Sequence, residues 1–382
     1  MEQDVYHWPT TDWKIKVRRA LLRWYQKQGR PLPWRMTPTP YAVWISEIML
    51  QQTQVATVID YFNRFLLRFP DISTLAKSNE EEVLHYWEGL GYYRRARQLH
   101  QAAQVIEQKH GGTFPQNFEE VLALPGVGRY TAGAICSIAY QQKKPILEAN
   151  TIRVYSRLLG YSGDWQKSAG QKILWQFAQE ILPRKKPGLF NQAMMDLGSQ
   201  LCKPKETDCL SCPLSAQCPT FANGWQKNIP APKKKTSFVE TTEALLLLEH
   251  QGSFLMRQYQ PGERWAGLWD FPRFKVEHVL PKTAEEVAHF FSEALTSKTP
   301  LLFAEGFAKL KTIKHGVTKY RITLESFQAT TTVRPTFSPK CTRGWQWKGV
   351  NQIKNLPLNT TGRQIFQRGI GLSAKLPLFE SA

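Results

Sequence analysis

The sequence predicts two domains, an all-α domain followed by an α+β domain. Its 382 residues are enough for two separate hydrophobic cores. Residues 224–238 contain two prolines and the consecutive lysines Lys233, Lys234 and Lys235, a composition typical of a linker. Helical stretches joined by glycine-containing turns precede this linker, whereas strand-like runs and one helical stretch follow it.

The charge of the chain indicates a polyanionic partner. Its 50 lysines and arginines against 31 acidic residues give a formal net charge of +19, which does not by itself distinguish DNA from RNA or a membrane surface. Residues 1–14 lack an apolar signal core, and the longest aliphatic run, Ala244–Leu248, is too short to span a bilayer. The absence of a signal core favours a cytoplasmic protein. We also expect a monomer with no membrane partner.

The helix expected to begin after Thr39 carries the first candidate catalytic residue. Thr39 suits the N-cap, and Pro40 suits the first helical position. Val43, Glu47 and Leu50 fall on one face of this helix, which predicts a partly desolvated carboxyl with a raised pKa. A neutral carboxyl can donate a proton, so Glu47 is a candidate general acid. The alternative is a solvated glutamate at the edge of an apolar stripe.

Two further segments contain residue types that suit nucleic acid. The amides of Gln51, Gln52 and Gln54 can donate to and accept from base edges, although they also suit a wet helix surface. The segment Gly89–Tyr93 reads Gly-Leu-Gly-Tyr-Tyr, and three of the next four residues are arginines. Aromatic rings beside arginines on a glycine-rich turn favour a stacking surface or a wedge. The alternative is a helical turn with core tyrosines.

Residues Leu124–Ala134 read Leu-Pro-Gly-Val-Gly-Arg-Tyr-Thr-Ala-Gly-Ala and predict two helices joined by a tight turn. Pro125 should end the first helix, and the second should begin just after the turn. Gly126, Val127 and Gly128 leave the N–H groups of the turn bare at a helix N-terminus, where a phosphate can bind. The alternative is a plain turn between helices.

A second candidate carboxylate, Glu148, lies after an apolar run and just before a helix expected over Thr151–Leu159. Its alternative role is a helix-start charge that complements the helix dipole.

Four cysteines form the strongest single signal in the sequence. They follow the pattern Cys202-x6-Cys209-x2-Cys212-x5-Cys218, which is typical of a Cys₄ metal site. The spacing leaves both zinc and an iron–sulfur cluster open, because both are bound by four cysteines.

Taken together, these motifs resemble those of the MutY-type adenine DNA glycosylases of the endonuclease-III-like superfamily. The matching stretches are Leu32–Arg35, Ser46–Val55, Gly89–Tyr93, Leu124–Ala134, Phe190–Gly198 and the four cysteines. The resemblance implies an all-α helix-hairpin-helix DNA glycosylase domain over residues 1–223, with the active site in a cleft between two helical subdomains. It also implies that residues 202–218 form a [4Fe–4S] loop.

The resemblance assigns roles to individual residues. Glu47 falls at the position of the acid that protonates adenine at N7, Glu148 at that of the second carboxylate, and Tyr130 at that of its brace. The family usually has Asp-Gly where this chain has Glu148-Ala149. The implied adenine pocket is Arg30, Trp34, Arg35, Leu50, Val55 and Gln192. The implied DNA-binding residues are Gln51, Gln52, Tyr92, Gly126, Val127 and Gly128, with Gln52 and Tyr92 filling the gap or wedging the duplex after the base flips.

The expected substrate is adenine opposite 8-oxoguanine or guanine in double-stranded DNA. Bifunctional relatives have a lysine where this chain has Tyr130, and tyrosine cannot form the Schiff base that cuts the strand. We therefore expect a monofunctional glycosylase. The alternatives are a glycosylase with relaxed opposite-base specificity and an endonuclease-III-type glycosylase-lyase.

Residues 239–372 show an α+β pattern that resembles the Nudix-like domain that reads 8-oxoguanine. A hairpin is expected over 240–259, a helix over Thr283–Leu295 and a strand over Tyr320–Gln328. The reading loop then includes Val317, Thr318 and Lys319. A nucleotide pyrophosphatase is the rival interpretation, but the helix lacks the Arg-Glu-x-x-Glu-Glu-x-Gly core that would bind Mg²⁺. A non-catalytic DNA-binding protein is a third.

Overall fold

The computed structural model describes residues 8–232, 237–277, 280–295, 307–334 and 344–369. Parts of three predictions lie outside these described residues. They are the first residues of the segment without a signal core, the lysine run of the linker, and residues 278–279, 296–306, 335–343 and 370–372 of the predicted C-terminal domain.

The chain divides into two compact units. The helical unit contains residues 1–77 and 98–234, and the C-terminal unit contains residues 78–97 and 235–382. The short segment Ser78–Arg97 therefore packs with the C-terminal unit, although it lies within the stretch for which the sequence predicts the glycosylase domain.

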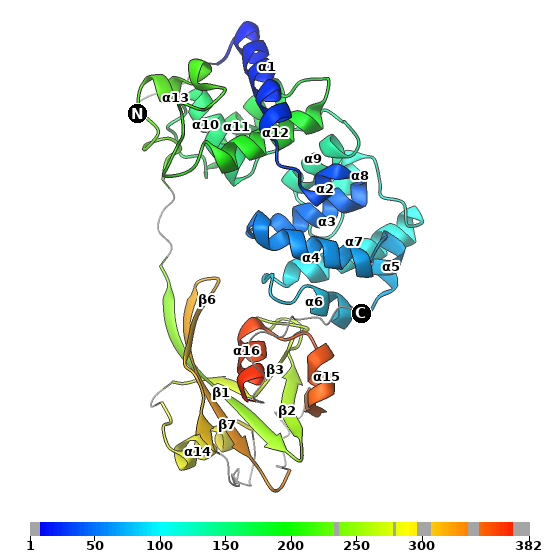
Figure 1. The fold of residues 1–382 in the computed structure, drawn as a ribbon, viewed down its shortest axis with the longest axis vertical. Coiled ribbons are helices and arrows are strands. Elements are labelled where there is room, and N and C mark those ends of the chain that lie inside the picture. Colours follow the sequence, from blue (N-terminus) through cyan, green and yellow to red (C-terminus); the bar gives the residue numbers. More distant parts are fainter. Residues whose placement is uncertain (1–7, 233–236, 278–279, 296–306, 335–343, 370–382) are drawn as a thin grey trace. The chain divides into compact units, whose positions relative to one another are not determined.

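The first part of the chain is helical (Figure 1). The helices are α1 (Thr11–Gln28), α2 (Pro33–Met36), α3 (Pro40–Leu50), α4 (Val55–Arg68), α5 (Ile72–Lys77), α6 (Glu80–Tyr86), α7 (Arg94–His110), α8 (Phe118–Leu122), α9 (Arg129–Ile138), α10 (Ala149–Leu159), α11 (Ser168–Ile181), α12 (Pro187–Gln200), the 3₁₀ turn η1 (Ser215–Gln217) and α13 (Pro219–Ala222). Among the described residues, no helix is both long and apolar enough to cross a membrane.

The predicted helix starts are confirmed where local chemistry determines them. Thr39 caps α3 by accepting a hydrogen bond from the Ala42 N–H at 3.1 Å, with Pro40 at the first helical position. Gly126 has φ +76°, a conformation that favours glycine, and a Cβ there would lie 2.8 Å from Cβ of Gln98. Gly128 is the N-cap of α9, as the hairpin pattern predicts.

Helix α12 holds the helical unit together by packing against α1, α9 and α10. A Cβ at Gly188 would lie 2.4 Å from the carbonyl oxygen of Ser137 in α9, so the two helices meet backbone to backbone. Buried side chains of α1, α10, α11 and α12 form a shared core. Helix α3 packs on the other side of α9.

The described residues of the C-terminal unit form a mixed sheet of eight strands. They are β1 (Val239–His250), β2 (Ser253–Gln258), β3 (Trp269–Asp270), β4 (Arg273–Lys275), β5 (Ala308–Lys309), β6 (Ile313–Val317), β7 (Tyr320–Thr330) and β8 (Trp345–Gly349). The main strand order is β3-β2-β1-β7-β5; β4 pairs with β1, β6 with β7 and β8 with β2. Strands β1 and β7 are parallel, and the predicted β1–β2 hairpin is confirmed by the pair Glu249 and Phe254.

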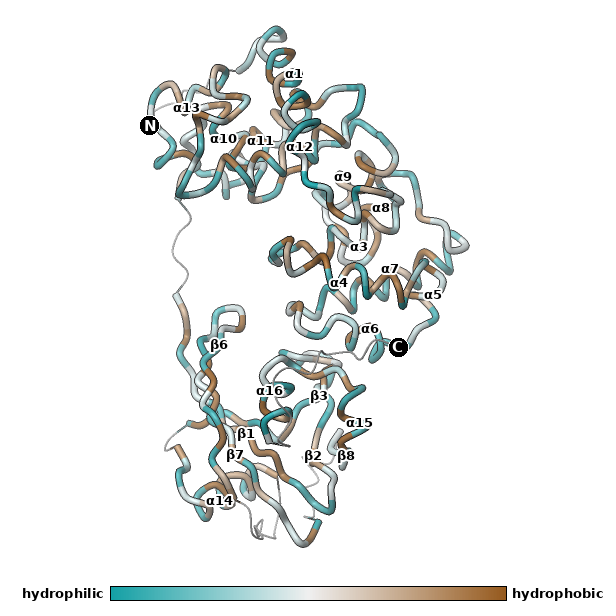
Figure 2. The backbone as a smooth tube through the Cα atoms, in the orientation of Figure 1, coloured by the Kyte–Doolittle hydropathy of each residue, from teal (hydrophilic) through white to brown (hydrophobic). Residues whose placement is uncertain are grey.

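Strand β1 is part of the hydrophobic centre of the C-terminal unit in Figure 2. Its alternate residues belong to two cores, one on each face of the sheet. Leu245 and Leu247 pack on the face covered by α15 (Val350–Asn355) and α16 (Thr360–Gly369). Leu246 and Leu248 pack on the face covered by α14 (Ala284–Leu295). The aliphatic run is therefore a fully buried strand between two helical layers.

Candidate active site

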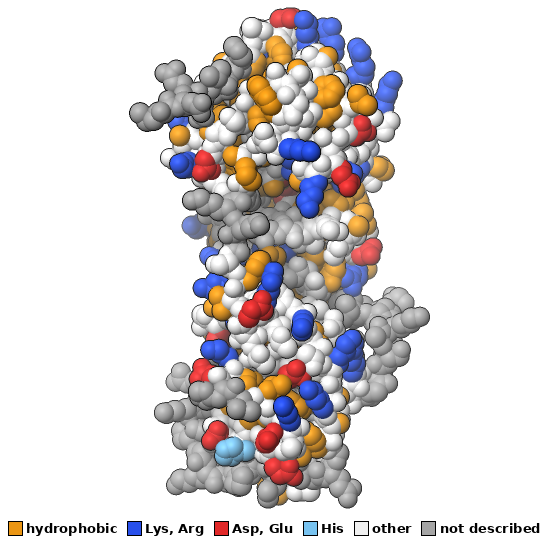
Figure 3. All heavy atoms as spheres, turned by 90° about the vertical axis from the view of Figure 1, so that its left-hand side faces the viewer, with side chains coloured by type: hydrophobic (Ala, Val, Ile, Leu, Met, Phe, Trp, Pro, Cys, Tyr) orange, Lys and Arg blue, Asp and Glu red, His pale blue; other side chains and the backbone are white. Residues whose placement is uncertain are grey.

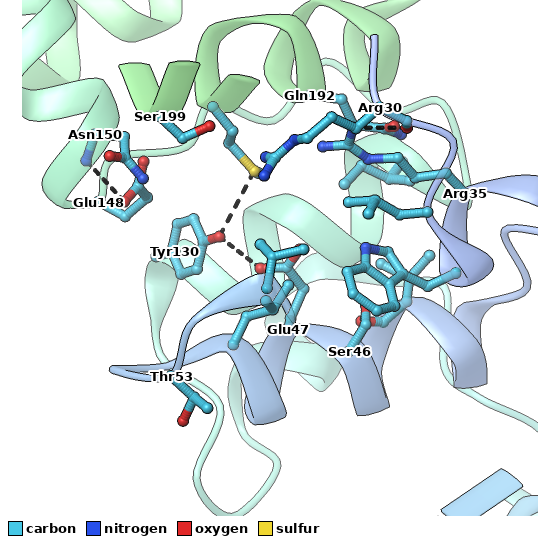
Figure 4. Close-up of a pocket in the computed structure, with 17 residues that line it drawn as sticks. Arg30, Arg35, Ser46, Glu47, Thr53, Tyr130, Glu148, Asn150, Gln192 and Ser199 are labelled. Atoms are coloured by element: carbon cyan, nitrogen blue, oxygen red, sulfur yellow. Dashed lines mark hydrogen bonds between the residues drawn. The ribbon is translucent and has the colours of Figure 1, made fainter. Parts of the chain in front are cut away.

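A single pocket in the helical unit brings together all nine residues predicted for catalysis and for the adenine pocket (Figure 4). Helices α2, α3, α4, α9, α10 and α12 and the loops between them supply its wall. The nine predicted residues are Arg30, Trp34, Arg35, Glu47, Leu50, Val55, Tyr130, Glu148 and Gln192; the others are Leu32, Val43, Ser46, Thr53, Ile138, Asn150, Met195 and Ser199.

Glu47 is buried in the wall of this pocket, with 5% of its surface exposed. All of Tyr41–Met49 is buried, so α3 is enclosed on all sides and has no solvated edge. Burial raises the pKa of Glu47 to about 7, with a further contribution from the charge of Glu148, while a hydrogen bond from Tyr130 acts to lower it. The carboxyl is therefore desolvated, as the sequence predicts, and the alternative of a solvated glutamate is wrong.

The structure corrects the predicted contact of Tyr130. Its hydroxyl donates to Oε2 of Glu47 at 2.5 Å and lies 3.9 Å from the sulfur of Met195, so it braces Glu47 rather than Glu148 (Figure 4). The reason is that α9 packs directly against α3. Burial and the charges of both carboxylates raise the pKa of Tyr130 well above its usual value, which keeps the hydroxyl a donor.

Glu148 is the N-cap of α10 and also lines the pocket. Its carboxylate accepts hydrogen bonds from the N–H groups of Asn150 at 2.8 Å and Thr151 at 2.9 Å, while Thr151 Oγ1 accepts from the Glu148 N–H. Burial raises its pKa, although the two backbone hydrogen bonds act in the opposite direction. Glu148 therefore caps α10 and also lines the pocket that contains Glu47 and Tyr130.

A buried carboxylate that the sequence analysis missed orients the two pocket arginines. Asp196 is fully buried and accepts hydrogen bonds from Arg30 Nε at 2.9 Å and from Arg35 Nη1 at 2.8 Å. Burial acts to raise the pKa of Asp196, but the two arginines hold it below its usual value. Its position four residues after Gln192, on the same face of α12, is the signal that could have identified it.

The sequence analysis also missed several polar residues that line the pocket: Ser46, Thr53, Asn150 and Ser199. Asn150 is the most accessible to sequence reasoning, because it lies two residues after Glu148 at the start of the same helix. The other three lie on α3, in the turn after it and on α12, and their sequence neighbours do not indicate that these elements meet at one pocket.

Two predicted DNA-contact residues have left-handed backbone conformations that side chains other than glycine rarely adopt. Gln52 has φ +60° in the turn after α3, and Tyr92 has φ +47° in the C-terminal unit. The side chain of Gln51 reaches Oγ1 of Thr131 at 3.5 Å. In the predicted phosphate seat, Val127 is buried, and a Cβ at Gly128 would meet no atom within 4 Å. The outer side of this turn is therefore open.

The predicted reading loop is a two-residue turn between β6 and β7. Val317 pairs with Tyr320, which places Thr318 and Lys319 at the exposed tip. Thr318 has φ +52°, a strained conformation for a β-branched residue, and its hydroxyl donates to the Val317 carbonyl at 2.7 Å.

The four clustered cysteines line one small cavity in the helical unit. All four are free thiols, and Arg157 Nη1 lies 3.2 Å from Sγ of Cys202. Arg157 is 3% exposed, and its other hydrogen bonds go to backbone carbonyls, so its charge is available to a negatively charged group held by the thiolates. The donor set fits an iron–sulfur cluster. In the part of the chain that the structure describes, no group of three His, Cys, Asp or Glu side chains is placed to hold one metal ion.

Comparisons with known proteins agree with both units. Residues 45–180 match the HhH-GPD superfamily of base excision DNA repair proteins, and residues 243–368 match the NUDIX domain. The chain is 40% identical to an adenine DNA glycosylase of Buchnera aphidicola (subspecies Acyrthosiphon pisum), over 69% of this chain and 75% of the relative. It is 32% identical to that of Rattus norvegicus, over 92% of this chain and 77% of the relative. The solved structure of a thermostable thymine-DNA glycosylase matches 56% of this chain and 98% of its own, with 29% identity and a TM-score of 0.52.

Replacing Asp196 by asparagine should destabilise the helical unit strongly. The variant leaves Arg30 and Arg35 side by side without a carboxylate, and breaking a buried ion pair costs about 3–5 kcal/mol. Asp12→Asn is the control, because its ion pair with Lys16 is exposed and should contribute less than about 1 kcal/mol. Denaturant unfolding measures both, and equal losses would contradict the structural role of Asp196.

Since the pKa of Asp196 is lowered, its contribution to the free energy of unfolding should persist at neutral pH and be lost only below about pH 4.

Proposed function

The chain belongs to the adenine DNA glycosylases, a family of base excision repair enzymes, and from this premise we propose that it releases adenine paired with 8-oxoguanine or guanine in duplex DNA. The observation that carries the proposal is the buried carboxyl of Glu47, whose pKa of about 7 leaves it substantially protonated at neutral pH. A second carboxylate, Glu148, lines the same pocket.

In the proposed reaction, Glu47 transfers its proton to N7 of adenine as the bond between the base and C1′ of the sugar breaks. The electron pair of that bond leaves with the base, so adenine departs neutral and the sugar carries oxocarbenium charge. Tyr130 supports this step by donating to one oxygen of Glu47, which leaves the other to carry the proton.

Glu148 is proposed to stabilise the sugar cation. Two backbone N–H groups hold its carboxylate in place, so the anion is oriented before the charge develops. Water then adds its oxygen to C1′, and the ionised Glu47 accepts the released proton. This restores the acid for the next turnover.

The flipped adenine is proposed to occupy the space lined by Arg30, Arg35, Trp34, Leu50, Val55 and Gln192. The Gly126–Gly128 turn is proposed to bind a DNA phosphate, because Gly128 is the N-cap of α9 and a Cβ there would meet no atom within 4 Å. Lysine and arginine side chains lie on the face of the helical unit seen in Figure 3. Gln52 is proposed to fill the gap left by the base. Tyr92 is proposed as the wedge, because the residue is 49% exposed on a strained turn.

The C-terminal unit is proposed to bind the base opposite adenine through Val317, Thr318 and Lys319. A pyrophosphatase would need carboxylates on α14 that are free to hold Mg²⁺. Glu286 instead accepts hydrogen bonds from the N–H groups of Lys282 and Thr283 at the start of that helix. The exposed polar tip of the β6–β7 turn supports a binding role instead.

Cys202, Cys209, Cys212 and Cys218 are proposed to hold a [4Fe–4S] cluster, for which the family is known. Arg157 and Gln226 would direct N–H groups at its sulfur ligands, Gln226 Nε2 lying 3.8 Å from Sγ of Cys209. When bound, the cluster fixes the 202–218 loop. Lys203 and Lys205, which are exposed on this loop, are then proposed to contact DNA phosphates.

Glu47→Gln should reduce adenine release by about 10²–10⁴-fold while leaving binding to an A:8-oxoguanine duplex intact, because the amide keeps the shape but has no acidic proton. Single-turnover release and duplex binding measure the two effects. Asp60→Asn, an exposed carboxylate on α4, is the matched control and should behave as wild type. The active form has Glu47 protonated and Glu148 ionised, so the wild-type rate should fall about tenfold per pH unit above pH 7 and should fall again at acidic pH, where Glu148 becomes protonated. Wild-type release by Glu47→Gln would show that another group is the acid.

The enzyme should release adenine without cutting the strand, because Tyr130 has no amine with which to form a Schiff base. Product strands should remain intact until they are heated in alkali, and borohydride should trap no protein–DNA adduct. Gel analysis of the labelled strand tests this directly. Strand cleavage at neutral pH together with a trapped adduct would mean that a lysine elsewhere attacks the sugar.

The purified protein should be brown and contain iron and sulfide in equal amounts. Cys209→Ser should lose the colour and most of the iron, whereas Cys136→Ser should retain both, because Cys136 is buried in α9 and does not line the cavity of the four clustered cysteines. A colourless, folded wild-type protein with one zinc per chain would instead establish a structural zinc site.

A further inference from the structure

A buried ion pair joins the segment Ser78–Arg97, from the first half of the chain, to helix α16 of the C-terminal unit. Arg363 of α16 donates to both oxygens of Glu88, from Nε at 2.7 Å and from Nη2 at 2.9 Å. The two side chains are 9% and 4% exposed. Arg363 also donates to the carbonyls of Ile353 and Leu356, so its orientation is fixed. Residues 275 positions apart are thus held in one geometry.

Leu358, which precedes α16, makes two more hydrogen bonds to the segment that contains Glu88. The N–H of Leu358 donates to Oε2 of Glu88 at 3.0 Å, and its carbonyl accepts from the hydroxyl of Tyr93 at 3.4 Å. That hydroxyl in turn accepts from the N–H of Gly89 at 3.2 Å. The C-terminal domain therefore holds both ends of the Gly89–Tyr92 turn.

The turn itself is built to present Tyr92. Gly89 and Gly91 have φ +97° and +70°, and the indole of Trp87 donates to the Gly91 carbonyl at 3.1 Å. Arg95 donates to the carbonyls of Leu90 and Gly91, and its guanidinium lies 5.5 Å from the ring centre of Tyr92. The strained backbone of Tyr92 persists only if the surrounding residues hold it in place. These hydrogen bonds do so while the side chain stays exposed.

We propose that Glu88, Arg363 and Leu358 are positioning residues through which the C-terminal domain sets the geometry of the Tyr92 wedge. The inference rests on the proposed wedge role of Tyr92. A buried pair between planar groups is seldom more stable than apolar side chains of similar volume, but its two parallel hydrogen bonds fix one orientation. The domain that is proposed to read the opposite base thereby also places the residue that opens the duplex.

A double-mutant cycle with Tyr92→Ala tests this coupling in the full-length chain. The paired variant Glu88→Gln/Arg363→Met removes both charges and leaves neither unpaired. Single-turnover adenine release and the fluorescence of 2-aminopurine beside the target adenine, which reports flipping, are the readouts. We expect the paired variant to slow flipping and release by about tenfold when Tyr92 is present, since small displacements in a preorganised site are costly. With Tyr92→Ala in place, the paired variant should cause no further loss.

Two further variants separate positioning from a general loss of structure. Lys275→Met/Glu277→Gln removes an exposed pair in the same unit and should leave both readouts unchanged. Arg363→Lys keeps the charge but cannot make the bidentate pair of hydrogen bonds to Glu88. The variant should therefore fold and show the same Tyr92-dependent loss of flipping and release. Equal losses with and without Tyr92, in either variant, would overturn the proposal and leave the pair a purely structural role. Wild-type flipping by Tyr92→Ala would instead remove the wedge role, and with it the premise.

Discussion

The active site depends on how closely α12 approaches α9 and α10. A Cβ at Gly188 would lie 2.4 Å from the Ser137 carbonyl oxygen, and one at Gly198 would lie 2.7 Å from Cβ of Asn150. The backbone of α9 cannot move away, so contact at this distance requires glycine. The buried amide of Asn191 then donates to the Ser137 hydroxyl at 2.8 Å and fixes the rotation of α12. Because of this packing, α12 presents its polar face to the pocket formed by α3 and α9.

The same packing sets the electrostatic balance of the pocket. Arg35 acts to lower the pKa of Glu47, and alone it would favour the ionised carboxylate. Two hydrogen bonds from Arg35 to Asp196 compensate much of that charge, so burial remains the dominant effect on Glu47. Asp196 does not line the pocket, yet it keeps an arginine beside a general acid without depriving the acid of its proton. Substrate recognition by arginine and proton donation by glutamate are compatible for this reason.

Local patterns in the sequence are sufficient to find Glu47, the glycine hairpin and the cysteine cluster, because spacing along one helix or loop determines each. They are not sufficient to find what these residues contact. The hydrogen bond from Tyr130 to Glu47 spans 83 positions, and that from Arg35 to Asp196 spans 161. Periodicity indicates which face of a helix is buried but not which element covers it. It therefore predicts one apolar face for α3, whereas the structure encloses the helix entirely, and it assigns Ser78–Arg97 no partner in the C-terminal unit.

Glu148 both caps α10 and places a carboxylate in the pocket wall. Its side chain turns back onto its own helix, where one oxygen accepts from the N–H of Asn150 and the other from that of Thr151. Each oxygen retains a lone pair, so capping does not consume the anion, and the helix N-terminus stabilises its charge. These two hydrogen bonds tie the position of the carboxylate to the start of α10. That start lies close against α12, because a Cβ at Gly198 would be 2.7 Å from Cβ of Asn150.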